Sequence, residues 1–519
     1  MKIPAARRAA PYAVPGYVAG TMSVSRRKVL VGAAAAAFAP RLGWAGTAER
    51  TNPRSIAVGD VTSQAATLWA RGRREGRLLV QLSKDPDFRT VREIMGPLAS
   101  ADTDFTARMR VEELPAREQL YWRATLDAQG DRAEWMTGSF RTAGAGRDVR
   151  FAWGGDTCGQ GWGINDEAGG MRIFDAIRQH RPDFLIHAGD LVYSDGPLPE
   201  SVRLPDGSTW RNLVTPEVAK VSETLAELRG RFRYNHIDEH FRAMLSEVPI
   251  LHMWDDHEVR NNWWPGSKVR DKRYAAKNTN EILPHARRAF HEYTPTESTQ
   301  IYRKVEYGPL VDVFLLDTRS YRGPNSAGQQ AWYHPGSYWL GPFQRDWLKV
   351  ELARSKARWK IVCNDMPLGI IARRQGQAND NAANTSGPPL GRELEIAHIL
   401  KYLRDSNVQN VVWLTADLHY ATATHYTPER ARFKDFTPFW EFMAGPLHAG
   451  TGSTHKLDAT FGARTEWISI DEHTRHHASP AEGAQFYGMV EIASATGDLT
   501  VSFHNQEQQE LHRLTLTAS

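Results

Sequence analysis

The stretch VRFAWGGDTCGQGWG (residues 149–163) joins a short apolar run to a glycine-rich loop that carries an aspartate and a cysteine. The apolar run, Val149–Trp153, predicts a buried strand. Asp156 and Cys158 follow the end of that strand, so both side chains could face one point beyond it. Ligands bind beyond the carboxyl ends of strands in α/β sheets. The stretch therefore predicts an α/β sheet with a metal site at its edge.

The residues downstream extend this pattern. A helix-like stretch at residues 170–180 precedes another strand-like run at 184–188, and such alternation is typical of an α/β core. Residues 373–391 are polar and rich in Asn and Gly, which predicts a mobile loop. A hairpin is expected around Thr496–Asp498. The later strands are expected at residues 250–254, 310–316, 359–363, 411–414, 489–492 and 499–503.

The residues upstream have a different pattern. Between residue 52 and about residue 145, short runs of β-forming residues alternate with turn residues, and no helical period intrudes. A small antiparallel sandwich fits this pattern best. The segment holds no cluster of acids with histidine, so we assign it no chemistry. The sequence thus predicts a β domain over residues 46–146 and a catalytic domain over 147–519.

The first 45 residues have the features of a leader. Arg26-Arg27 precedes an apolar, alanine-rich stretch, Val29–Phe38, and small residues follow at Gly43-Trp-Ala45. This pattern resembles a twin-arginine export signal and implies a periplasmic or secreted protein. The alternative is a disordered N-terminus with a chance arginine pair. Translation could begin at Met1 or at Met22.

The leader also accounts for the net charge of +4. It holds seven Lys or Arg and no acid, and subtracting these seven charges leaves −3 for the remainder. A protein of that charge gives no electrostatic reason to expect nucleic-acid binding. No run of about 20 apolar residues occurs, so we expect no membrane-spanning helix.

Five strand-like runs are each followed at once by acids, His, Asn or Tyr. One aspartate after a strand is weak evidence, because aspartate often caps a helix there, but five such clusters make capping a poor explanation. Carboxylates brought together in one crevice would be driven to protonate unless cations lay between them. Two metal ions about 3.5–4 Å apart and bridged by one carboxylate are the usual device for phosphate-ester hydrolysis. The clusters are Asp156-Thr-Cys158, Gly189-Asp-Leu-Val-Tyr193, Asp255-Asp-His-Glu-Val-Arg-Asn-Asn262, Asn364-Asp-Met-Pro367 and Asp417-Leu-His419.

The order of these motifs resembles that of the calcineurin-like metallophosphoesterases, and within them the PhoD-type alkaline phosphatases. Gly189-Asp-x-x-Tyr193 is similar to the variant of purple acid phosphatases, and Trp254-Asp-Asp-His-Glu258 with Asn261-Asn262 is the most PhoD-specific element. The resemblance implies an α/β fold, a sandwich of two mixed β-sheets flanked by helices. The domain before it would be a small all-β, immunoglobulin- or fibronectin-like domain.

The resemblance also implies an asymmetric pair of metals. Phenolate, thiolate and imidazole suit ferric iron, whereas carboxylates and amide oxygens suit calcium or another hard divalent cation. A Cys158–Cys363 disulfide is the alternative to a cysteine ligand, since export permits one. The implied iron ligands are Asp156, Cys158, Asp190 as the bridging carboxylate, Tyr193 and His419; the implied ligands on the other side are Asp256, Asn261, Asp365 and Asp417.

The implied reaction is in-line attack of a metal-bound hydroxide on phosphorus. His257 would protonate the leaving oxygen, or alternatively orient an aspartate. Arginines suit the non-reacting phosphate oxygens, although Arg319 could instead form a salt bridge with Asp317. The residues expected to bind substrate are Arg260, Arg319, Arg322 and His448.

Together these features predict an exported alkaline phosphatase, a hydrolase of phosphomonoesters and phosphodiesters. Its partners would be small or polymeric phosphate esters and the twin-arginine export machinery. A phosphodiesterase of phospholipase D type is the alternative within hydrolases. A non-catalytic envelope binding protein is the alternative from another class, and a full set of ligands beside His257 argues against it.

Overall fold

The computed structural model describes residues 50–126, 134–372, 378, 380–384 and 387–519. The predicted leader lies outside the described residues, and so does most of residues 373–379. Gly46–Ser519 form one compact unit. Where the β domain ends and the catalytic domain begins stays a prediction.

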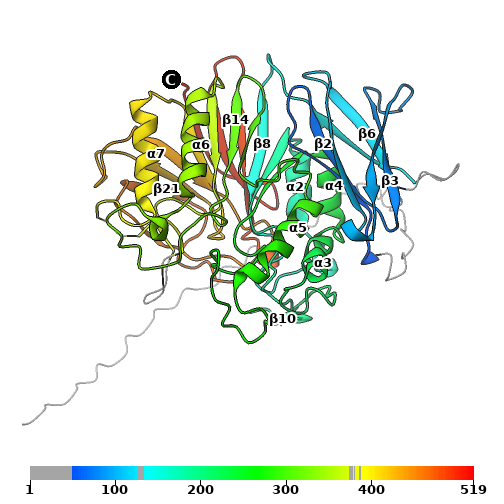
Figure 1. Ribbon diagram of the computed structural model, residues 1–519, viewed down its shortest axis with the longest axis horizontal. Coiled ribbons are helices and arrows are strands. Elements are labelled where there is room, and N and C mark those ends of the chain that lie inside the picture. The colour runs from blue at the N-terminus through cyan, green and yellow to red at the C-terminus, as the bar shows by residue number, and fades with distance from the viewer. Residues whose placement is uncertain (1–49, 127–133, 373–377, 379, 385–386) are drawn as a thin grey trace, which may run out of the picture. The chain divides into compact units, whose positions relative to one another are not determined.

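Two antiparallel sheets form the N-terminal part of this unit, at one end of the molecule in Figure 1. Most of the apolar side chains of these strands are buried, and Leu68, Leu78 and Trp122 are fully enclosed, whereas Met95 and Leu98 are exposed. The predicted β-rich segment is confirmed, although the sequence patterns overlooked β4 and β7, and the immunoglobulin-like comparison stays a prediction. One sheet contains β1 (Ser55–Gly59), β2 (Ala66–Arg71) and β5 (Thr106–Val111), and the other contains β4 (Arg92–Ala99), β3 (Gly76–Ser83), β6 (Gln119–Thr125) and β7 (Met136–Arg141), in spatial order.

The first large sheet of the catalytic part is mixed and has six strands. Its first three strands are parallel, and the last three are antiparallel to their neighbours. The expected hairpin around Thr496–Asp498 is confirmed, because β22 and β23 pair on either side of it. The spatial order is β12 (Ile250–Met253), β9 (Phe184–Ala188), β8 (Val149–Gly154), β22 (Phe486–Ile492), β23 (Leu499–Asn505) and β24 (Glu510–Leu516).

The second large sheet is also mixed and has seven strands, of which β14, β15, β17 and β19 are parallel. In spatial order they are β13 (Arg303–Glu306), β14 (Val311–Leu315), β15 (Trp359–Cys363), β17 (Val411–Thr415), β19 (Phe439–Met443), β18 (Thr422–Tyr426) and β21 (Ala463–Ile468). Two small ribbons pair β10 (Ser201–Arg203) with β11 (Thr209–Arg211) and β16 (Ile370–Ile371) with β20 (Lys456–Leu457).

Helices cover the outer faces of these sheets (Figure 1). The α3 helix begins at a capping box of Thr224 and Glu227, and α4 begins where the Asp238 side chain accepts from the Phe241 amide. The α-helices within residues 51–519, as far as these are described, are α2 (Arg172–Gln179), α3 (Leu225–Asn235), α4 (Glu239–Glu247), α5 (Leu283–Tyr293), α6 (Gly341–Arg354) and α7 (Glu393–Asp405). Short 3₁₀ turns lie at Ala101–Thr103, Asp166–Ala168, Thr279–Glu281, Pro335–Ser337 and Pro480–Glu482.

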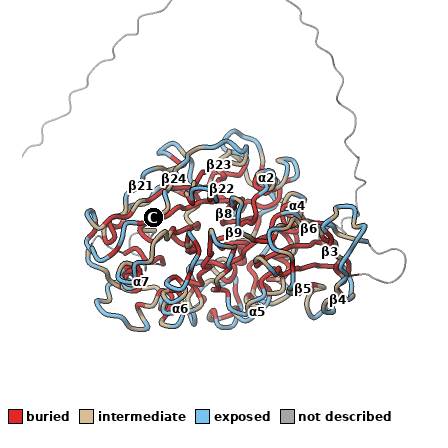
Figure 2. The backbone as a smooth tube through the Cα atoms, turned by 90° about the horizontal axis from the view of Figure 1, so that it is seen from above, coloured by how far each residue is buried: buried red, intermediate tan, exposed pale blue. Residues whose placement is uncertain are grey.

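Both faces of the parallel strands are buried, which is why their sequences are continuously apolar. Val362 packs in the cluster beneath α6 and α7, whereas its neighbour Ile361 belongs to the core between the sheets. Across that core, the Trp467 and Phe503 rings are stacked with centroids 4.8 Å apart. Figure 2 shows the buried backbone running through the middle of the molecule. The predicted pair of mixed sheets is confirmed.

The polar segment at residues 373–391 is not a mobile loop throughout. Residues 373–377, 379, 385 and 386 lie outside the described residues, but residues 380–384 are all buried. The Asn381 amide donates to the Ile370 carbonyl, and the Asn384 amide nitrogen of the backbone donates to Asp458 and Glu393. The asparagines there satisfy buried hydrogen bonds, which composition alone cannot distinguish from solvation.

None of the described helices is long and apolar enough to cross a membrane.

Candidate metal centre

The predicted clusters meet because neighbouring strand-end loops are joined through their backbones. The Asp156 amide donates to the Gly189 carbonyl at 3.3 Å, and the Thr157 amide donates to the Asp190 carbonyl at 2.8 Å. A third loop joins them, since the His448 amide donates to the Asp156 carbonyl at 2.9 Å. These bonds hold the loop after β8 between the loop after β9 and the loop after β19.

Five of the predicted ligands have left-handed backbones, Cys158 with a φ angle of 57° and four others. The φ angle is 70° at Asp156, 52° at Asp190, 73° at Asp417 and 60° at His419. Non-glycine residues adopt this region rarely, and such outliers gather at functional sites, where the surrounding structure holds them at a cost on the order of 1–3 kcal/mol each. Left-handed backbone conformations thus occur where the carboxylates and the imidazole converge.

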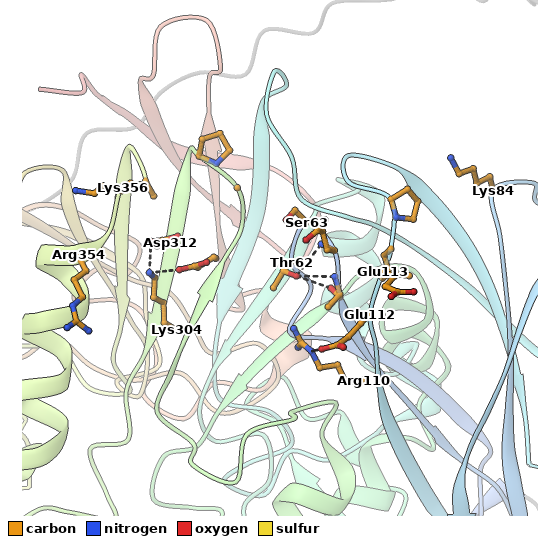
Figure 3. A pocket seen from close by; sticks show the side chains of 18 residues that line it. Thr62, Ser63, Lys84, Arg110, Glu112, Glu113, Lys304, Asp312, Arg354 and Lys356 are labelled. Carbon is orange, nitrogen blue, oxygen red and sulfur yellow. Dashed lines mark hydrogen bonds and ion pairs between the residues drawn. The ribbon is translucent and has the colours of Figure 1, made fainter.

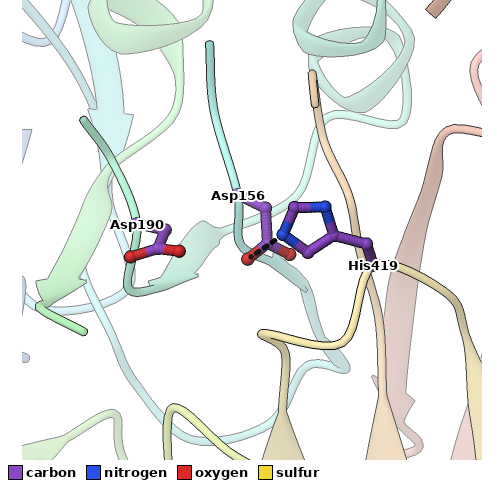
Figure 4. Close-up of side chains that lie close together, drawn as sticks. All are labelled: Asp156, Asp190 and His419. Carbon is purple, nitrogen blue, oxygen red and sulfur yellow. Dashed lines mark ion pairs between the residues drawn. The ribbon is translucent and has the colours of Figure 1, made fainter. Parts of the chain in front are cut away.

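Two groups of potential metal-ligating atoms occur at this point, and they share one carboxylate. Asp156, Asp190 and His419 form the first group, and Asp190, Asp256 and His257 form the second; within each group the atoms lie within 4.8 Å of one another. Figure 4 shows the first group, with the His419 ring directed at Asp156 beside Asp190. Asp190 therefore occupies the position expected of a bridging ligand.

The electrostatics of the site fit a bound cation. Both carboxylate oxygens of Asp156 and Oδ1 of Asp256 are buried without a hydrogen-bond partner. Burial, reinforced by Asp417, raises the pKa of Asp156 well above its usual range, and burial raises the pKa of Asp190 likewise. The pKa of Asp417 is raised to about 8, mainly by burial and next by the negative charge of Asp256. A cation between these carboxylates would bind the unpaired oxygens and offset the burial and repulsion that raise the pKa values. The residues present therefore fit a metal.

His419 is held in the form that a metal requires. Its Nδ1 donates to the Gly450 carbonyl, which leaves the lone pair of Nε2 facing the site. That Nε2 lies 2.9 Å from the Tyr193 hydroxyl and 3.5 Å from Oδ1 of Asp156. Burial lowers the pKa of His419 to about 3, so the ring is neutral.

The Tyr193 ring explains one glycine of the opening stretch. A Cβ on Gly159 would lie only 2.3 Å from this ring, so the loop after β8 can approach the phenol only without a side chain there. Tyr193 is buried and reaches the first group through its hydroxyl.

His257 is positioned by a residue that the sequence analysis missed. Its Nδ1 lies 2.6 Å from Oδ1 of Asp195, and its Nε2 points into the site, 3.7 Å from Oδ1 of Asp256. The ring stacks on Tyr193 with centroids 4.3 Å apart. Burial alone would lower the pKa of His257, but Asp195 and then Asp256 raise it well above its usual value. Asp195 follows Tyr193 by two residues, and this proximity was the available signal.

Cys158 is buried, and its thiol contacts Met171 and belongs to neither of the two groups found among the described residues. Sγ lies 3.2 Å from Sδ of Met171, and burial raises the pKa of the thiol well above its usual value. Cys363 is buried as well, and both cysteines are free, so the alternative of a disulfide is not realised here. The role of Cys158 as an iron ligand stays a prediction.

The amide beside the second group comes from Asn262 rather than Asn261. Asn261 is exposed and contributes its backbone amide, which donates to Asp195 at 2.8 Å. With its nitrogen turned inward, the Asn262 side chain lies 3.1 Å from Oδ2 of Asp256. Asp365 is buried nearby but is held by the Met366 amide at 2.8 Å and by Arg319.

Arg319 is placed differently from the sequence-based expectation. Its guanidinium is completely buried and pairs with carboxylates at 2.6, 3.0 and 2.9 Å, so it is engaged within the protein rather than open to a phosphate. The alternative partner, Asp317, instead accepts the backbone amide of Arg319 at 3.2 Å. The three carboxylates belong to Asp255, Asp365 and Asp380.

Of the other three residues expected to bind substrate, two are buried and one is half-buried. Arg322 is buried and lies 3.3 Å from Asp380. His448 is buried, with Nε2 3.1 Å from the Gly163 carbonyl, so its side chain supports the loop after β8. Arg260 is half-buried, with its guanidinium 6.0 Å from the centre of the Tyr274 ring.

A separate groove of about 1300 Å³ lies between the N-terminal sheets and the amino-terminal edge of the seven-stranded sheet (Figure 3). Its charged side chains are largely paired: Lys304 binds Glu306 and Asp312, and Arg110 binds Glu112. None of the candidate metal ligands lines it.

Comparison with known proteins bears on this arrangement. The profile of the PhoD-like phosphatase family matches residues 151–503, and the profile of that family's N-terminal domain matches residues 37–144. Alkaline phosphatase D of Bacillus subtilis (strain 168) is 24% identical over 441 residues, which cover 77% of this chain and 70% of that protein.

Solved structures agree with the fold. The structure of PhoD is similar with a TM-score of 0.66 and 17% identity, and the match covers 90% of this chain and 92% of that one. The purple acid phosphatase PPD1 of yellow lupin (Lupinus luteus) has a TM-score of 0.54 and 13% identity, with coverage of 89% and 74%. The family profile spans most of the chain and all the clusters described above, so this protein belongs to the PhoD-like phosphatases and is a phosphoric ester hydrolase.

Proposed function

We propose that this chain is an exported, metal-dependent alkaline phosphatase that hydrolyses phosphomonoesters and phosphodiesters at a two-site metal centre. The observation that carries the proposal is Asp156, whose two carboxylate oxygens are buried without a partner beside Asp190 and His419. A structural ion pair would supply a cationic side chain at this point, and the nearest donor is a neutral imidazole instead.

The donor set on each side suggests which metals are held. Carboxylate, phenolate and neutral imidazole from Asp156, Tyr193 and His419 suit ferric iron, with Asp190 shared between the sites. Asp256 and Asp417 offer carboxylate oxygen atoms that suit calcium or another hard divalent cation, and the Asn262 amide nitrogen lies 3.1 Å from Oδ2 of Asp256. When bound, such a pair polarises the phosphoryl group and activates water.

The chain's own residues then have distinct tasks. Asp190 belongs to both groups of candidate ligands and would hold the two halves of the site in register. His257 faces the same space through Nε2, and Asp195 orients its ring by accepting from Nδ1 at 2.6 Å. Asp195 and Asp256 also raise the pKa of His257 well above its usual value, so the ring is protonated at both nitrogens. The proton on Nε2 is then available to the leaving oxygen of the substrate. The Tyr193 ring, stacked on His257, limits the rotation of that imidazole.

The test uses Asp190→Asn, which preserves shape and removes the shared charge. We expect turnover of p-nitrophenyl phosphate and of bis-p-nitrophenyl phosphate to fall by at least about 1000-fold. The matched control is Asp206→Asn in the exposed turn between β10 and β11, where the Asp206 side chain accepts from Ser208, and its turnover should stay within about twofold of the wild type. Metal analysis of both proteins, purified without chelators, should find less metal in Asp190→Asn alone. Normal turnover by Asp190→Asn would refute the two-site centre.

Export by the twin-arginine route is part of the proposal and rests on Arg26-Arg27 and the apolar stretch after them. Replacing both arginines with lysine should retain the protein in the cytoplasm, measured by cell fractionation, whereas unimpaired export would remove this part.

A further inference from the structure

The loop after β19, residues 444–452, is bonded to two candidate ligands of the first group, Asp156 and His419. On the side of Asp156, the His448 amide donates to the Asp156 carbonyl at 2.9 Å, and the His448 carbonyl accepts from the Cys158 amide at 2.7 Å. This part of the loop therefore supports the left-handed turn that carries Asp156.

The other end of the same loop holds His419. The Gly450 carbonyl accepts from Nδ1 of the His419 ring, and the Gly452 amide donates to the His419 carbonyl at 2.8 Å. A neutral imidazole carries one proton, so a carbonyl at Nδ1 keeps the proton there and leaves the lone pair on Nε2. A metal binds the nitrogen that has the lone pair. The position of the Gly450 carbonyl therefore determines whether Nε2 can be a ligand.

Ala449 lies between these two ends of the loop, and the side chain of Gln485 holds it. Nε2 of Gln485 donates to the Ala449 carbonyl at 2.9 Å, and Oε1 accepts from the Ala449 amide at 3.1 Å. Each bonded group belongs to a planar peptide unit, one shared with the His448 carbonyl and the other with the Gly450 nitrogen. The Gln485 amide therefore fixes the orientation of both peptide units beside Ala449.

This contact is enclosed and is anchored in the other large sheet. Gln485 and Ala449 are each 0% exposed, so a backbone group that lost its partner there would have no water to replace it. Gln485 directly precedes β22 of the six-stranded sheet, and the amide of the next residue, Phe486, donates to the Pro446 carbonyl at 3.1 Å. The start of β22 thus holds a loop that belongs to the seven-stranded sheet.

We propose that Gln485 is a positioning residue of the metal centre, which keeps the Gly450 carbonyl at Nδ1 of His419 and thereby keeps Nε2 free to bind a metal. The inference rests on the proposed function, because it concerns ligands of the proposed centre. Gln485 acts only through the backbone of Ala449. Without Gln485 the loop can turn the Gly450 carbonyl away, and the ring can place its proton on Nε2, which lies 3.5 Å from Oδ1 of Asp156. An internal hydrogen bond would then replace a metal ligand.

A purely structural role is the alternative, in which Gln485 only pairs buried backbone groups. Gln344 in α6 is a matched control, because this glutamine makes the same two bonds to Asp317 and is 1% exposed. Its Oε1 accepts from the Asp317 amide and its Nε2 donates to the Asp317 carbonyl, both at 2.8 Å. Loss of either glutamine amide leaves one backbone amide and one carbonyl unpaired, but of the two glutamines it is Gln485 that holds the loop at His419.

The first test reads the tautomer of His419 in metal-free protein. Histidine is labelled with ¹⁵N, metal is removed by chelation, and the spectrum of His419→Gln identifies the His419 signals by their loss. The wild type and Gln344→Leu should carry the proton on Nδ1, whereas Gln485→Leu should show a proton on Nε2 or a mixture of the two tautomers. An unchanged tautomer in Gln485→Leu, or the same change in both leucine variants, would overturn the inference.

Gln485→Glu tests the same contact with a side chain of the same shape, which keeps the inference testable if Gln485→Leu fails to fold. When protonated, the new carboxyl group can accept from the Ala449 amide and donate to its carbonyl, as the glutamine does. When ionised, it repels that carbonyl. Buried glutamates titrate as high as about pH 8–9. The ratio of variant to wild-type kcat should therefore fall as pH rises from about 6 to 10, and a ratio that does not fall would contradict the inference.

Metal retention provides a readout that does not depend on turnover. Residues that orient metal ligands typically contribute about 10- to 100-fold to metal affinity. Gln485→Leu should therefore lose metal at a chelator concentration about 10- to 100-fold lower than the wild type does at the same pH. Retention equal to that of the wild type would overturn the inference. A wild type that has the expected tautomer but binds no metal would instead refute the proposed function, because the tautomer is measured without metal.

Discussion

Replacing Arg319 with methionine distinguishes an internal role from a phosphate-binding role for this residue. The guanidinium is completely buried and pairs with Asp255, Asp365 and Asp380 at 2.6, 3.0 and 2.9 Å. Methionine keeps most of the aliphatic part of the side chain but removes the cation paired with Asp255 and Asp365, whereas Asp380 keeps Arg322 at 3.3 Å. Removing one partner of a buried pair typically destabilises by about 3–5 kcal/mol.

This loss can be converted to a melting temperature. Unfolding entropy of about 2.1 cal/mol/K per residue gives roughly 1 kcal/mol/K for a compact unit of this size, so Tm should fall by about 3–5 °C. Adding Asp255→Asn should recover part of the loss, because the carboxylate that Arg319 pairs with at 2.6 Å is then no longer charged. Arg354→Met is the control, since the Arg354 side chain is 73% exposed and its pair with Glu351 contributes at most about 1 kcal/mol.

Differential scanning calorimetry measures the stability and steady-state kinetics measures the substrate affinity of the same preparations. We expect the Tm of Arg319→Met to fall, with a loss of kcat that follows from displaced carboxylates. A Tm within 1 °C of the wild type, together with a KM raised about tenfold or more, would refute this reasoning. It would mean that the guanidinium is held for the substrate.

Three further predictions concern other parts of the molecule. Steady-state kinetics of Asp195→Asn should show kcat lowered by about 10- to 100-fold, with metal content retained. The loss should be smaller than the roughly 100- to 1000-fold expected for His257→Ala, because Asp195 acts only through His257. Equal loss of metal in both variants would instead place the two residues among the metal ligands. Thiol titration under denaturing conditions without reductant should find two free thiols, from Cys158 and Cys363, and loss of visible absorbance in Cys158→Ala would place that thiol at iron despite its contact with Met171. Burial lowers the pKa of His236 to about 3, so below about pH 6.5 the unfolded chain binds a proton there while the folded chain does not. The free energy of unfolding should therefore fall by about 2 kcal/mol between pH 7.5 and pH 5 because of this residue. Denaturant titrations of His236→Gln should show a correspondingly weaker dependence of the free energy of unfolding on pH.

The sequence predicted the parallel strands β8, β9, β12, β14, β15 and β17, because buried strands in α/β sheets are short, apolar and flanked by polar clusters; the parallel strand β19 was not among the expected strands, and no spatial order was predicted. β4 could not be found this way: five of its eight residues are exposed, so no burial pattern distinguishes it from a loop. The convergence of Asp156, Asp190 and His419 followed from the topology rule for strand ends. That rule brings loops together without specifying which atoms meet.

The details that the sequence did not predict depend on side-chain partners far apart in the chain. Asp380 lies in a segment whose composition predicted a mobile loop. Its carboxylate is instead buried, where it pairs with the buried guanidinium of Arg319 at 2.9 Å. Arg319 in turn could not be separated from a phosphate-binding arginine by sequence, since both occur just after a strand. The direction of the Cys158 thiol depends on Met171, thirteen residues away, and no spacing rule relates the two.

The left-handed backbones at Asp156, Asp190, Asp417 and His419 limit how this enzyme could evolve or be engineered. Side chains branched at Cβ clash in that conformation whatever metal they would bind, so the substitutions open to these positions are chiefly asparagine, aspartate, histidine and glycine. Asp256 and Asp365 have ordinary backbones and accept a wider range of residues. Changes in metal preference within a lineage should therefore accumulate at Asp256 and Asp365 first, with the left-handed positions alternating only among the few residues that their conformation tolerates.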